Sequence, residues 1–355
     1  MFKDRKILLT GHTGFKGAWM TAWLNQLGAH IYGLALPPES EDWLFVQAGL
    51  AEVCDHFIGD IRDFSCVRNR IDAVQPDLIF HLAAQPLVRE SYKTPVETAA
   101  ANIMGSIHVM EAVRLLDMPC AVVMVTSDKC YENREQNHCY REDEPMGGHD
   151  VYSASKGCAE LMIASYRRSF FSTSETVRLA SARAGNVIGP GDWAADRIVP
   201  DAIRAFSKGE PLVVRNPQAV RPWQHVLEPL GGYLRLAECL LEESGGEYTE
   251  GWNFGPENAS ARTVADVADG MISHWQGTRW QSPPRSGDPH EATLLQLDIQ
   301  KAKQRLDWQP VWDFDETIQR TVLGYQALLA ARGDVERTRT FLRQEIEAYE
   351  RGARD

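Results

Sequence analysis

A tyrosine and a lysine lie four residues apart in Tyr152-Ser153-Ala154-Ser155-Lys156. On a helix, this spacing puts the phenol and the ammonium on the same face. The lysine charge favours the phenolate and lowers the pKa of the tyrosine toward the range of a useful base. The pair therefore predicts the removal of a proton from a bound hydroxyl group.

A serine at the end of an apolar run strengthens this prediction. Residues 121–125 have the pattern of a buried strand, and Thr126-Ser127-Asp128-Lys129-Cys130-Tyr131 follow it. A hydroxyl group and two charged side chains are thus expected where a strand leaves a sheet. The alternative is that Asp128 and Lys129 only cap a surface loop.

A glycine-rich turn indicates what these residues act with. In Thr10-Gly11-His12-Thr13-Gly14-Phe15-Lys16-Gly17, three glycines are spaced three apart between an apolar run at 6–9 and a helical pattern at 18–27. Glycine lets a ligand approach the backbone closely, and a helix N-terminus favours a pyrophosphate. We expect a nucleotide to bind at Gly11, Thr13, Gly14, Phe15, Lys16 and Gly17. The alternative is a tight turn whose glycines serve packing alone.

The sequence around these motifs alternates between strand and helix patterns. Apolar runs at 6–9, 30–36, 56–58, 78–80, 121–125 and 177–182 alternate with helical patterns that include 63–74, 96–116 and 152–170. Strands that are apolar throughout are typical of a parallel sheet covered on both faces. The sequence therefore predicts an α/β fold, a doubly wound parallel sheet of Rossmann type.

This alternation ends near residue 186. Turns, prolines and short strands then separate helical patterns near 199–208, 226–241, 263–275, 299–306, 315–332 and 335–350. We expect residues 1–185 to form the nucleotide-binding domain, with later segments near 226–258 returning to it. Residues 186–355 are expected to form mainly a smaller, mixed substrate-binding domain.

The composition limits the partners and the compartment. A net charge of −12 over 355 residues argues against nucleic acid, because neutralising phosphates takes clustered Lys and Arg. Seven cysteines without a CxxC pair or a zinc-type spacing indicate free thiols and no metal site. The apolar runs are too short for a signal sequence or a membrane span. We expect a cytoplasmic protein without membrane contact.

The residues after the second strand favour NAD over NADP. Leu36-Pro37-Pro38-Glu39-Ser40 lacks the usual acidic residue at the strand end, so Glu39 or Ser40 is left to contact the ribose. No Lys or Arg lies between Lys16 and Arg62 to bind a 2′-phosphate. Asp60 and Ile61 are expected to border the adenine. The cofactor is expected to cross Leu82, Ala83, Ala84 and Gln85, although helix–strand packing would also explain Ala83 and Ala84.

Six segments together resemble the extended short-chain dehydrogenase/reductase family. They are the glycine turn, the strand end with Ser127, the Tyr152 and Lys156 pair, and the segments Ala84-Gln85-Pro86-Leu87-Val88-Arg89, Arg183-Ala184-Gly185-Asn186 and Arg221-Pro222-Trp223-Gln224-His225-Val226. Within that family the chain is most similar to the 4,6-dehydratases that act on CDP-linked glucose. The match is spread over most of residues 7–260 and is looser in the C-terminal hundred.

The resemblance implies a three-stage reaction on a nucleotide sugar, with CDP-glucose as the expected substrate. Tyr152 would take a proton from the sugar 4-hydroxyl while hydride leaves C4 for NAD. Lys156 would hold the phenolate and the nicotinamide ribose, and Ser127 would bond the developing carbonyl. Water would then leave across C5 and C6, and the hydride would return to C6. The 4-keto-6-deoxy product belongs to deoxysugar biosynthesis, as for lipopolysaccharide O-antigen.

Elimination requires an acid for the 6-hydroxyl and a base at C5, and the resemblance implies Asp128 and Lys129 for this place. Asp128 is expected to be the acid. Related dTDP-glucose dehydratases have Asp-Glu here, so Lys129 departs from the wider group while matching the enzymes of CDP-sugars. A lysine with a pKa of about 10.4 is a poor base unless its surroundings depress that pKa. Lys129 would therefore act either as a depressed base or as a cation that stabilises the enolate.

The substrate diphosphate is expected to bind Asn186, Arg197, Arg204 and Arg221, because bidentate arginine suits phosphate oxygens. Arg221 is the best placed of these by the family motif, and ordinary solvated charge would also explain Arg204. His225 and His290 are expected to be structural. Trp193 and Trp223 either line the sugar or base pocket or belong to an aromatic core.

Two other functions would use the same residues. A sugar-nucleotide 4-epimerase shares Ser127, Tyr152 and Lys156, but it has no leaving group for Asp128 to protonate. A non-catalytic NAD sensor would not need the intact set. The apolar helices 96–116 and 152–170 also indicate a homodimer, which can pair further into a tetramer, because the family uses these two helices as a four-helix contact.

Overall fold

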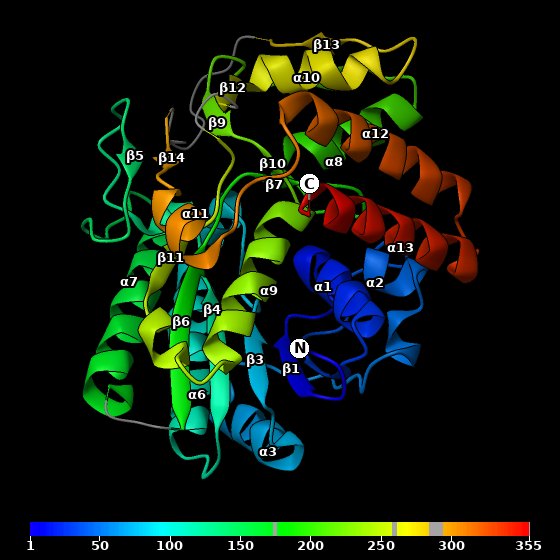
Figure 1. Cartoon of the computed structure of the whole chain (residues 1–355). Helices are drawn as coiled ribbons and strands as arrows, with labels where there is room; N and C mark the ends of the chain where they lie inside the picture. Colours follow the sequence, from blue (N-terminus) through cyan, green and yellow to red (C-terminus); the bar gives the residue numbers. More distant parts are fainter. Residues whose placement is uncertain (173–175, 258–260, 284–293, 355) are drawn as a thin grey trace.

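A six-stranded parallel sheet forms the centre of the computed structural model, which describes residues 1–172, 176–257, 261–283 and 294–354 (Figure 1). Its strand order is β11-β6-β4-β3-β1-β2. The strands are β1 (Lys6–Thr10), β2 (His30–Leu34), β3 (Leu78–His81), β4 (Cys120–Val125), β6 (Val177–Arg183) and β11 (Gly251–Asn253). Every neighbouring pair is parallel, so the carboxyl ends of all six strands meet at one edge. The predicted doubly wound sheet is confirmed.

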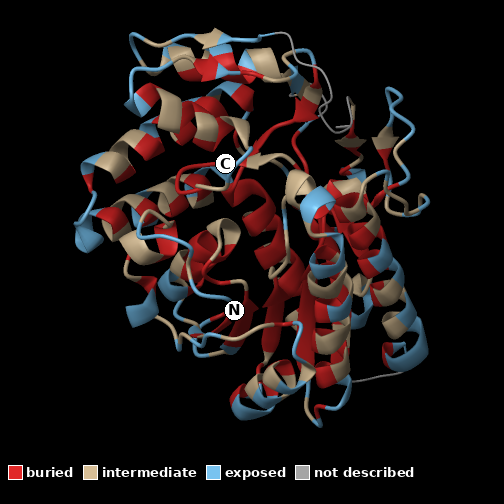
Figure 2. Ribbon diagram, turned by 180° about the vertical axis from the view of Figure 1, so that it is seen from behind, coloured by how far each residue is buried: buried red, intermediate tan, exposed pale blue. Residues whose placement is uncertain are grey.

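Helices cover both faces of this sheet because successive strand side chains point to opposite sides. Leu8, Ile79 and Val122 pack with α3 (Phe64–Val74), α6 (Gly105–Arg114) and α7 (Val151–Tyr166). Leu9 and Phe80 face the other way, toward α1 (Phe15–Gln26), α9 (Leu227–Leu241) and α13 (Val335–Gly352). Figure 2 shows the strands as the most buried part, between helices whose outer faces are exposed.

One predicted strand is wrong. Residues 56–58 make only isolated bridges to the β2 edge, between Tyr32 and Asp55 and between Ala35 and Ile58. Phe57 and Ile58 are exposed, so burial contributes little to holding this segment as a regular strand. The sixth strand is β11, which pairs with β6 and comes from the part of the chain after residue 186.

The predicted helix over 96–116 is interrupted. It divides into α5 (Pro95–Ala99), a π-helical turn η2 (Ala100–Met104) and α6. Inside the turn, Asn102 uses its side chain to bond the backbone of Gln85 and the hydroxyl of Ser155. Such π turns are common at functional sites. The α7 helix also ends in a π turn, η4 (Arg167–Phe171).

A second group of helices lies above the carboxyl edge of the sheet in Figure 1. Its core is formed by α8 (Ile198–Ser207), α10 (Val264–Ser273) and α12 (Phe314–Ala330).

The remaining helices are α2 (Leu44–Gln47), η1 (Leu50–Glu52), α4 (Val88–Lys93), η3 (Asp128–Cys130), η5 (Gly245–Tyr248) and α11 (Gln300–Leu306). Short strands pair as β5 (Cys139–Tyr140) with β14 (Gln296–Leu297), β7 (Val187–Ile188) with β10 (Gln224–His225), β8 (Leu212–Val213) with β13 (Trp280–Gln281) and β9 (Val220–Pro222) with β12 (Ala261–Thr263). The division near residue 185 stays a prediction.

Three sequence-based expectations concern membrane-spanning helices, metal ligands and the cysteines. Within the described ranges, no helix combines the length and apolar character needed to cross a membrane. Among the same residues, no three His, Cys, Asp or Glu side chains gather as a metal site. All seven cysteines are free thiols.

Candidate active site

Ser127 and Tyr152 meet at the carboxyl edge of the sheet. Ser127 follows β4, and Tyr152 lies in the first turn of α7, which the Asp150 carboxylate caps through the Ser153 N–H at 2.9 Å. The two hydroxyl groups are hydrogen-bonded, and both side chains are buried. The predicted base and the predicted carbonyl-binding group are therefore adjacent.

The electrostatics around Tyr152 differ from the prediction made from the Tyr-Lys spacing. Burial raises the pKa of Tyr152 to about 12, and the hydrogen bond from Ser127 only partly opposes this. Burial also lowers the pKa of Lys156 to about 8, against the nearby Glu160 charge. Desolvation dominates because both groups lie in the packed interior below the sheet edge.

Asp128 is held beside this pair. Its carboxylate is 1% exposed and accepts hydrogen bonds from the Ser127 hydroxyl at 2.9 Å and the Asn186 side-chain amide at 3.3 Å. Asn186, predicted to contact the substrate, therefore directs its amide to Asp128. Its backbone is left-handed, with φ of 50°, which turns the chain sharply after Gly185.

Lys129 lies on the next residue of the same short turn. Its backbone N–H donates to the Ser127 hydroxyl oxygen at 3.2 Å, and its side chain is partly exposed. The turn thus buries the carboxylate of Asp128, while the neighbouring Lys129 stays partly exposed. The two residues predicted for elimination have distinct environments.

The glycine turn fits the dinucleotide predicted for it. A Cβ on Gly11 would lie 2.7 Å from the Ala83 nitrogen, and one on Gly17 would lie 2.1 Å from the Gly11 carbonyl oxygen. Glycine is required at both places, because Gly11 packs on the loop after β3 and Gly17 packs on the backbone of Gly11 and His12 within the turn. A Cβ on Gly14 would meet only the Gly11 oxygen, at 3.4 Å. No side chain caps α1 at Gly14, so its first N–H groups are left for an anion.

Lys16 connects this turn with the catalytic residues. Its ammonium is 3.4 Å from the Tyr233 hydroxyl, and burial together with the charges of Arg197 and Lys156 lowers its pKa to about 7. Asp128 opposes the shift. Lys16 was predicted only as a cofactor contact, and the structure places it between the turn and the site of chemistry. Its neighbour Phe15 approaches Gly189 from the other side.

The adenosine side of the turn contains a cation that the linear sequence did not reveal. Arg70 reaches from α3 to the carbonyls of Gly33 at 3.2 Å and Asp55 at 2.8 Å, and it pairs with the Asp55 carboxylate. These contacts engage its guanidinium at the β2 edge. Thr13 donates to the Leu36 carbonyl at 2.9 Å and so joins the turn to the end of β2.

Asp60 and Ile61 follow at the same edge. Asp60 accepts hydrogen bonds from the backbone N–H and the guanidinium of Arg62, which lower the pKa of its carboxyl. Ile61 is buried and packs on Gly105, where a Cβ would meet its Cδ1 at 2.5 Å. Ile61 is therefore held from below by α6, while Asp60 stays partly exposed.

The loop after β3 is fixed by a polar network. Leu82, Ala83 and Ala84 lie partly exposed above it. Gln85 donates its backbone N–H to Asn102 at 2.8 Å and its amide to Thr98 at 2.9 Å. The loop expected to border the cofactor is thus tied to the π-helical turn and, through Asn102, to the catalytic helix.

The four predicted substrate residues divide into groups. Arg197 pairs with Asp192 at 2.8 Å and lies close enough to Tyr152 and Lys16 to affect their charges. Arg221 is buried in β9. Arg204 instead holds the loop before α8, through the Trp193 and Ala194 carbonyls and the Asp201 carboxylate.

Sequence reasoning missed two further arginines near Arg197. Asp196, with a left-handed φ of 63°, pairs with Arg89 at 3.3 Å and with Arg215 at 2.9 Å. Arg89 comes from α4 and Arg215 follows β8, so the pairs join the two parts of the chain. Arg89 belongs to the segment of residues 84–89 that resembles the family, so the sequence offered a reason to single it out. No motif in the sequence points to Arg215.

The aromatic residues take different positions. Trp223 is buried and donates to the Arg262 carbonyl. The Trp193 ring packs edge-on against Tyr325, and its buried Nε1 has no hydrogen-bond partner among the residues that the structure describes. His225 is enclosed by Trp19 and Trp312, and burial lowers its pKa to about 3, which suits a structural residue. His290 lies outside the described residues.

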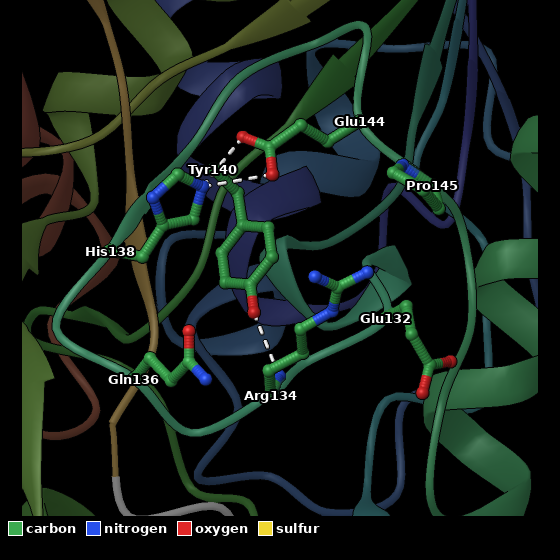
Figure 3. A pocket seen from close by; sticks show the side chains of 7 residues that line it. All are labelled: Glu132, Arg134, Gln136, His138, Tyr140, Glu144 and Pro145. Carbon is green, nitrogen blue, oxygen red and sulfur yellow. Dashed lines mark hydrogen bonds and ion pairs between the residues drawn. The ribbon is translucent and has the colours of Figure 1, made fainter.

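A hollow of about 180 Å³ opens in the loop that follows the catalytic turn (Figure 3). Its polar groups already bind each other: His138 pairs with Glu144 at 2.8 Å, and the Arg134 N–H donates to the Tyr140 hydroxyl at 2.8 Å. These contacts shape the loop between Tyr131 and Pro145. We assign no ligand to this hollow.

The chain was compared with known proteins. Residues 8–321 match the family described as GDP-mannose 4,6 dehydratase. A CDP-glucose 4,6-dehydratase of Salmonella typhimurium is 47% identical over 330 residues, which cover 92% of each protein.

Two solved structures share the fold. An epimerase of Methanothermobacter thermautotrophicus has a TM-score of 0.77 and 21% identity, and the match covers 94% of this chain and 95% of that one. A dTDP-glucose 4,6-dehydratase of Bacillus anthracis in complex with NAD has a TM-score of 0.71 and 19% identity, with 94% and 99% covered. Since the family match spans most of the chain and agrees with the similarity to the Salmonella protein, the chain belongs to the GDP-mannose 4,6 dehydratase family within the extended short-chain dehydrogenases/reductases.

Proposed function

We propose that the protein is an NAD-dependent CDP-glucose 4,6-dehydratase, which forms CDP-4-keto-6-deoxyglucose and water. The observation that carries this proposal is that Ser127 bonds both Tyr152 and Asp128. An epimerase needs the base but has no leaving group for a buried carboxylate beside it. The identity of 47% with the Salmonella CDP-glucose 4,6-dehydratase supports the choice of substrate.

In the first stage, the Tyr152 phenolate accepts the proton of the sugar 4-hydroxyl. NAD held at the glycine turn would supply the hydride acceptor for C4 and the hydride donor for C6. The Ser127 hydroxyl, already bonded to Tyr152, bonds the oxygen that becomes the C4 carbonyl. The Lys156 ammonium, one helical turn after Tyr152, favours the phenolate electrostatically. Gly11, Gly14 and Gly17 shape the cofactor turn, and its remaining contacts are Thr13, Phe15, Lys16, Asp60, Ile61 and the loop 82–85.

In the second stage, water leaves across C5 and C6. The 4-ketone acidifies the C5 proton, and loss of that proton forms an enolate. Asp128 then donates a proton to the 6-hydroxyl, the C6–O bond breaks, and a C5–C6 double bond forms. Lys129 serves the C5 side of the sugar, either as the acceptor of the C5 proton or, with another group accepting that proton, as the cation that stabilises the enolate. Addition of hydride at C6 and a proton at C5 completes the product.

The diphosphate of the substrate is assigned to the arginines around the sheet edge. Arg197 and Arg221 are the principal candidates, and the Arg89 and Arg215 pairs with Asp196 bring two more guanidinium groups to this region. Guanidinium groups suit the paired oxygens of a phosphate. Asn186 acts chiefly through Asp128, and Arg204 through the loop that precedes α8.

A homodimer in the cytoplasm completes the proposal, as does a place in deoxysugar biosynthesis such as that of lipopolysaccharide O-antigen. The helices on one side of the molecule expose apolar side chains: Val96 is 74%, Leu161 59% and Phe170 49% exposed. They belong to α5, α7 and η4. Pairing these helices with those of a second copy would cover all three residues.

The substrate assignment is tested with CDP-, UDP-, GDP- and dTDP-glucose, by following formation of the 4-keto product. We expect CDP-glucose to give at least tenfold higher kcat/KM than the other three. Tyr152→Phe serves as the blank. Preferred turnover of another nucleotide would contradict the assignment to CDP, and turnover of none would favour a sensor.

A further inference from the structure

A buried carboxylate that the reaction does not consume lies directly behind the catalytic residues. Glu160 is 2% exposed and lies on α7, four residues after Lys156. Residues at this spacing on a helix are neighbours, with Cβ atoms about 5–6 Å apart. The sequence alone indicates that Glu160 lies near the catalytic pair, because Tyr152, Lys156 and Glu160 are spaced four apart along one face of the helix.

Three elements of the site converge on this carboxylate. The Thr126 hydroxyl, next to Ser127 at the end of β4, donates to Oε1 at 2.5 Å. Ser181 and Arg183 of β6 both donate to Oε2 at 2.8 Å. Glu160 therefore joins the strand that leads to Ser127, the helix that carries Tyr152, and the strand that leads to Gly185 and Asn186.

Arg183 extends the connection to the loop after the catalytic turn. Its guanidinium donates to the Tyr131 hydroxyl at 2.6 Å and to the Glu142 carbonyl at 3.1 Å. Tyr131 in turn donates to Asn253 at 2.7 Å, at the end of β11. Both Glu160 and Arg183 are buried, so removing one would leave the charge of the other uncompensated.

The charges facing this region come from several elements. Lys156 is affected by Glu160 and by Cys130 of η3, and it in turn affects His81 of β3 and Lys16 of α1. Burial lowers the pKa of Lys156, and the charge of Glu160 opposes that shift.

Glu160 itself faces cations from other elements. Arg183 of β6 and Arg167 of η4 are both affected by its charge, as is Cys130. Burial alone would raise the pKa of Glu160, but the Arg183 charge and three hydrogen bonds hold it below its usual range. The carboxylate is thus ionised while it faces Lys156.

We propose that Glu160 is a positioning residue for the dehydration site: it locks Ser127 and the catalytic helix together and places a negative charge one helical turn after Lys156. Only the kinetic test of this role depends on the proposed function. The hydrogen bonds of Glu160 and its charge interaction with Lys156 involve the chain's own residues alone.

The first test compares pH profiles of Glu160→Gln and the wild type during C4 oxidation of CDP-glucose. Loss of the carboxylate should move the alkaline fall in kcat to lower pH by about one to two pH units, with KM little changed. Glu228→Gln is the matched control, because Glu228 is also a buried carboxylate and lies on α9. An unchanged profile in Glu160→Gln would overturn the electrostatic part.

The second test needs no turnover. Competitive labelling with acetic anhydride, followed by peptide mass spectrometry, gives the pH midpoint at which Lys156 becomes reactive. The midpoint should fall in Glu160→Gln and stay in place in Glu228→Gln. A fall without any activity on CDP-glucose would support the inference while contradicting the proposed function. An equal midpoint in both variants would overturn the inference even in a fully active enzyme.

Two further variants keep the test decisive should Glu160→Gln not fold. Glu160→Asp retains the charge and should keep the Lys156 midpoint within about half a pH unit of wild type. Thr126→Val removes only the 2.5 Å bond to β4, so kcat should fall at least tenfold without a shift in the profile. Wild-type kcat in Thr126→Val would overturn the positioning part, and a shifted midpoint in Glu160→Asp the electrostatic part.

Discussion

The Asp128 carboxylate occupies the space that a side chain on Gly185 would need. A Cβ at position 185 would lie 1.9 Å from Asp128 Oδ2 and 2.0 Å from its Cγ. Because Ser127 and Asn186 hold the carboxylate from two other sides, Gly185 fixes the remaining direction. The proposed acid is thus positioned partly by the absence of a side chain.

Gly185→Ala should therefore displace Asp128 and slow water loss by about tenfold or more. Oxidation at C4 should be much less affected, since the Ser127–Tyr152 contact does not involve position 185. Rapid mixing would follow NADH absorbance and 4-keto product separately. Gly246→Ala is the control, because a Cβ there meets nothing within 4 Å. Equal slowing of both stages would contradict a specific effect on Asp128.

Asp128→Asn removes the transferable proton and keeps the shape of the side chain. We expect reduced cofactor to accumulate on CDP-glucose while elimination slows by about 10²–10⁴-fold. Asp72→Asn, in an exposed ion pair of α3, should change neither stage. Elimination at the wild-type rate in Asp128→Asn would show that another group is the acid.

Tyr152→Phe should stop the reaction at its start. The variant loses the proton acceptor, so NADH formation on CDP-glucose should fall at least about 100-fold. Tyr166→Phe, on the same helix and bonded to Glu111, should retain activity. Normal NADH formation in Tyr152→Phe would refute the role of the phenol.

The catalytic pair and the cofactor turn could be predicted because they are local in sequence. Tyr152 and Lys156 share one helix, and the three glycines share one turn. The missing parts depend on contacts between distant segments. Arg70 reaches the β2 edge from α3, and the sixth strand is β11, which comes from a distant segment and pairs with β6 at the opposite edge of the sheet. The four-residue spacing between Lys156 and Glu160 can be read from the sequence. The three hydrogen-bond partners of Glu160 could not be predicted, because they lie on β6 and at the end of β4.

Glu228 predicts a pH-dependent stability. Burial raises its pKa from 4.5 to about 7, although the backbone N–H groups of Val311 and Trp312 and the Tyr349 hydroxyl all donate to it. A raised folded pKa means that the folded protein binds this proton more tightly. Its contribution is present below the unfolded pKa of 4.5 and is lost as pH rises through about 7, on the order of 3 kcal/mol.

Glu228→Gln should remove that dependence. The amide oxygen can accept from the backbone, while its nitrogen can donate to Tyr349. The Tm of the variant relative to wild type should therefore rise between pH 5 and pH 8, as read by calorimetry at about these two values. Glu238→Gln, partly exposed on the same helix, should give a nearly constant difference. A constant difference for Glu228→Gln would contradict the prediction.

Leu161 tests the proposed dimer. Leu161→Lys places a charge in the middle of the exposed apolar face of α7, so the variant should elute as a monomer in gel filtration at micromolar concentration. Leu323→Lys, at a similarly exposed site on α12, should leave the elution volume unchanged. A wild-type monomer, or an unchanged Leu161→Lys dimer, would contradict this contact.

The central claim is that one hydride moves from C4 to C6 of the same sugar. CDP-glucose deuterated at C4, turned over with unlabelled NAD and analysed by mass spectrometry and NMR, tests it most directly. If the C4 hydride is the one returned to C6, deuterium appears at C6 of the 4-keto-6-deoxy product. Deuterium retained at C4 of an epimerised sugar, or a product without deuterium at C6, would contradict it.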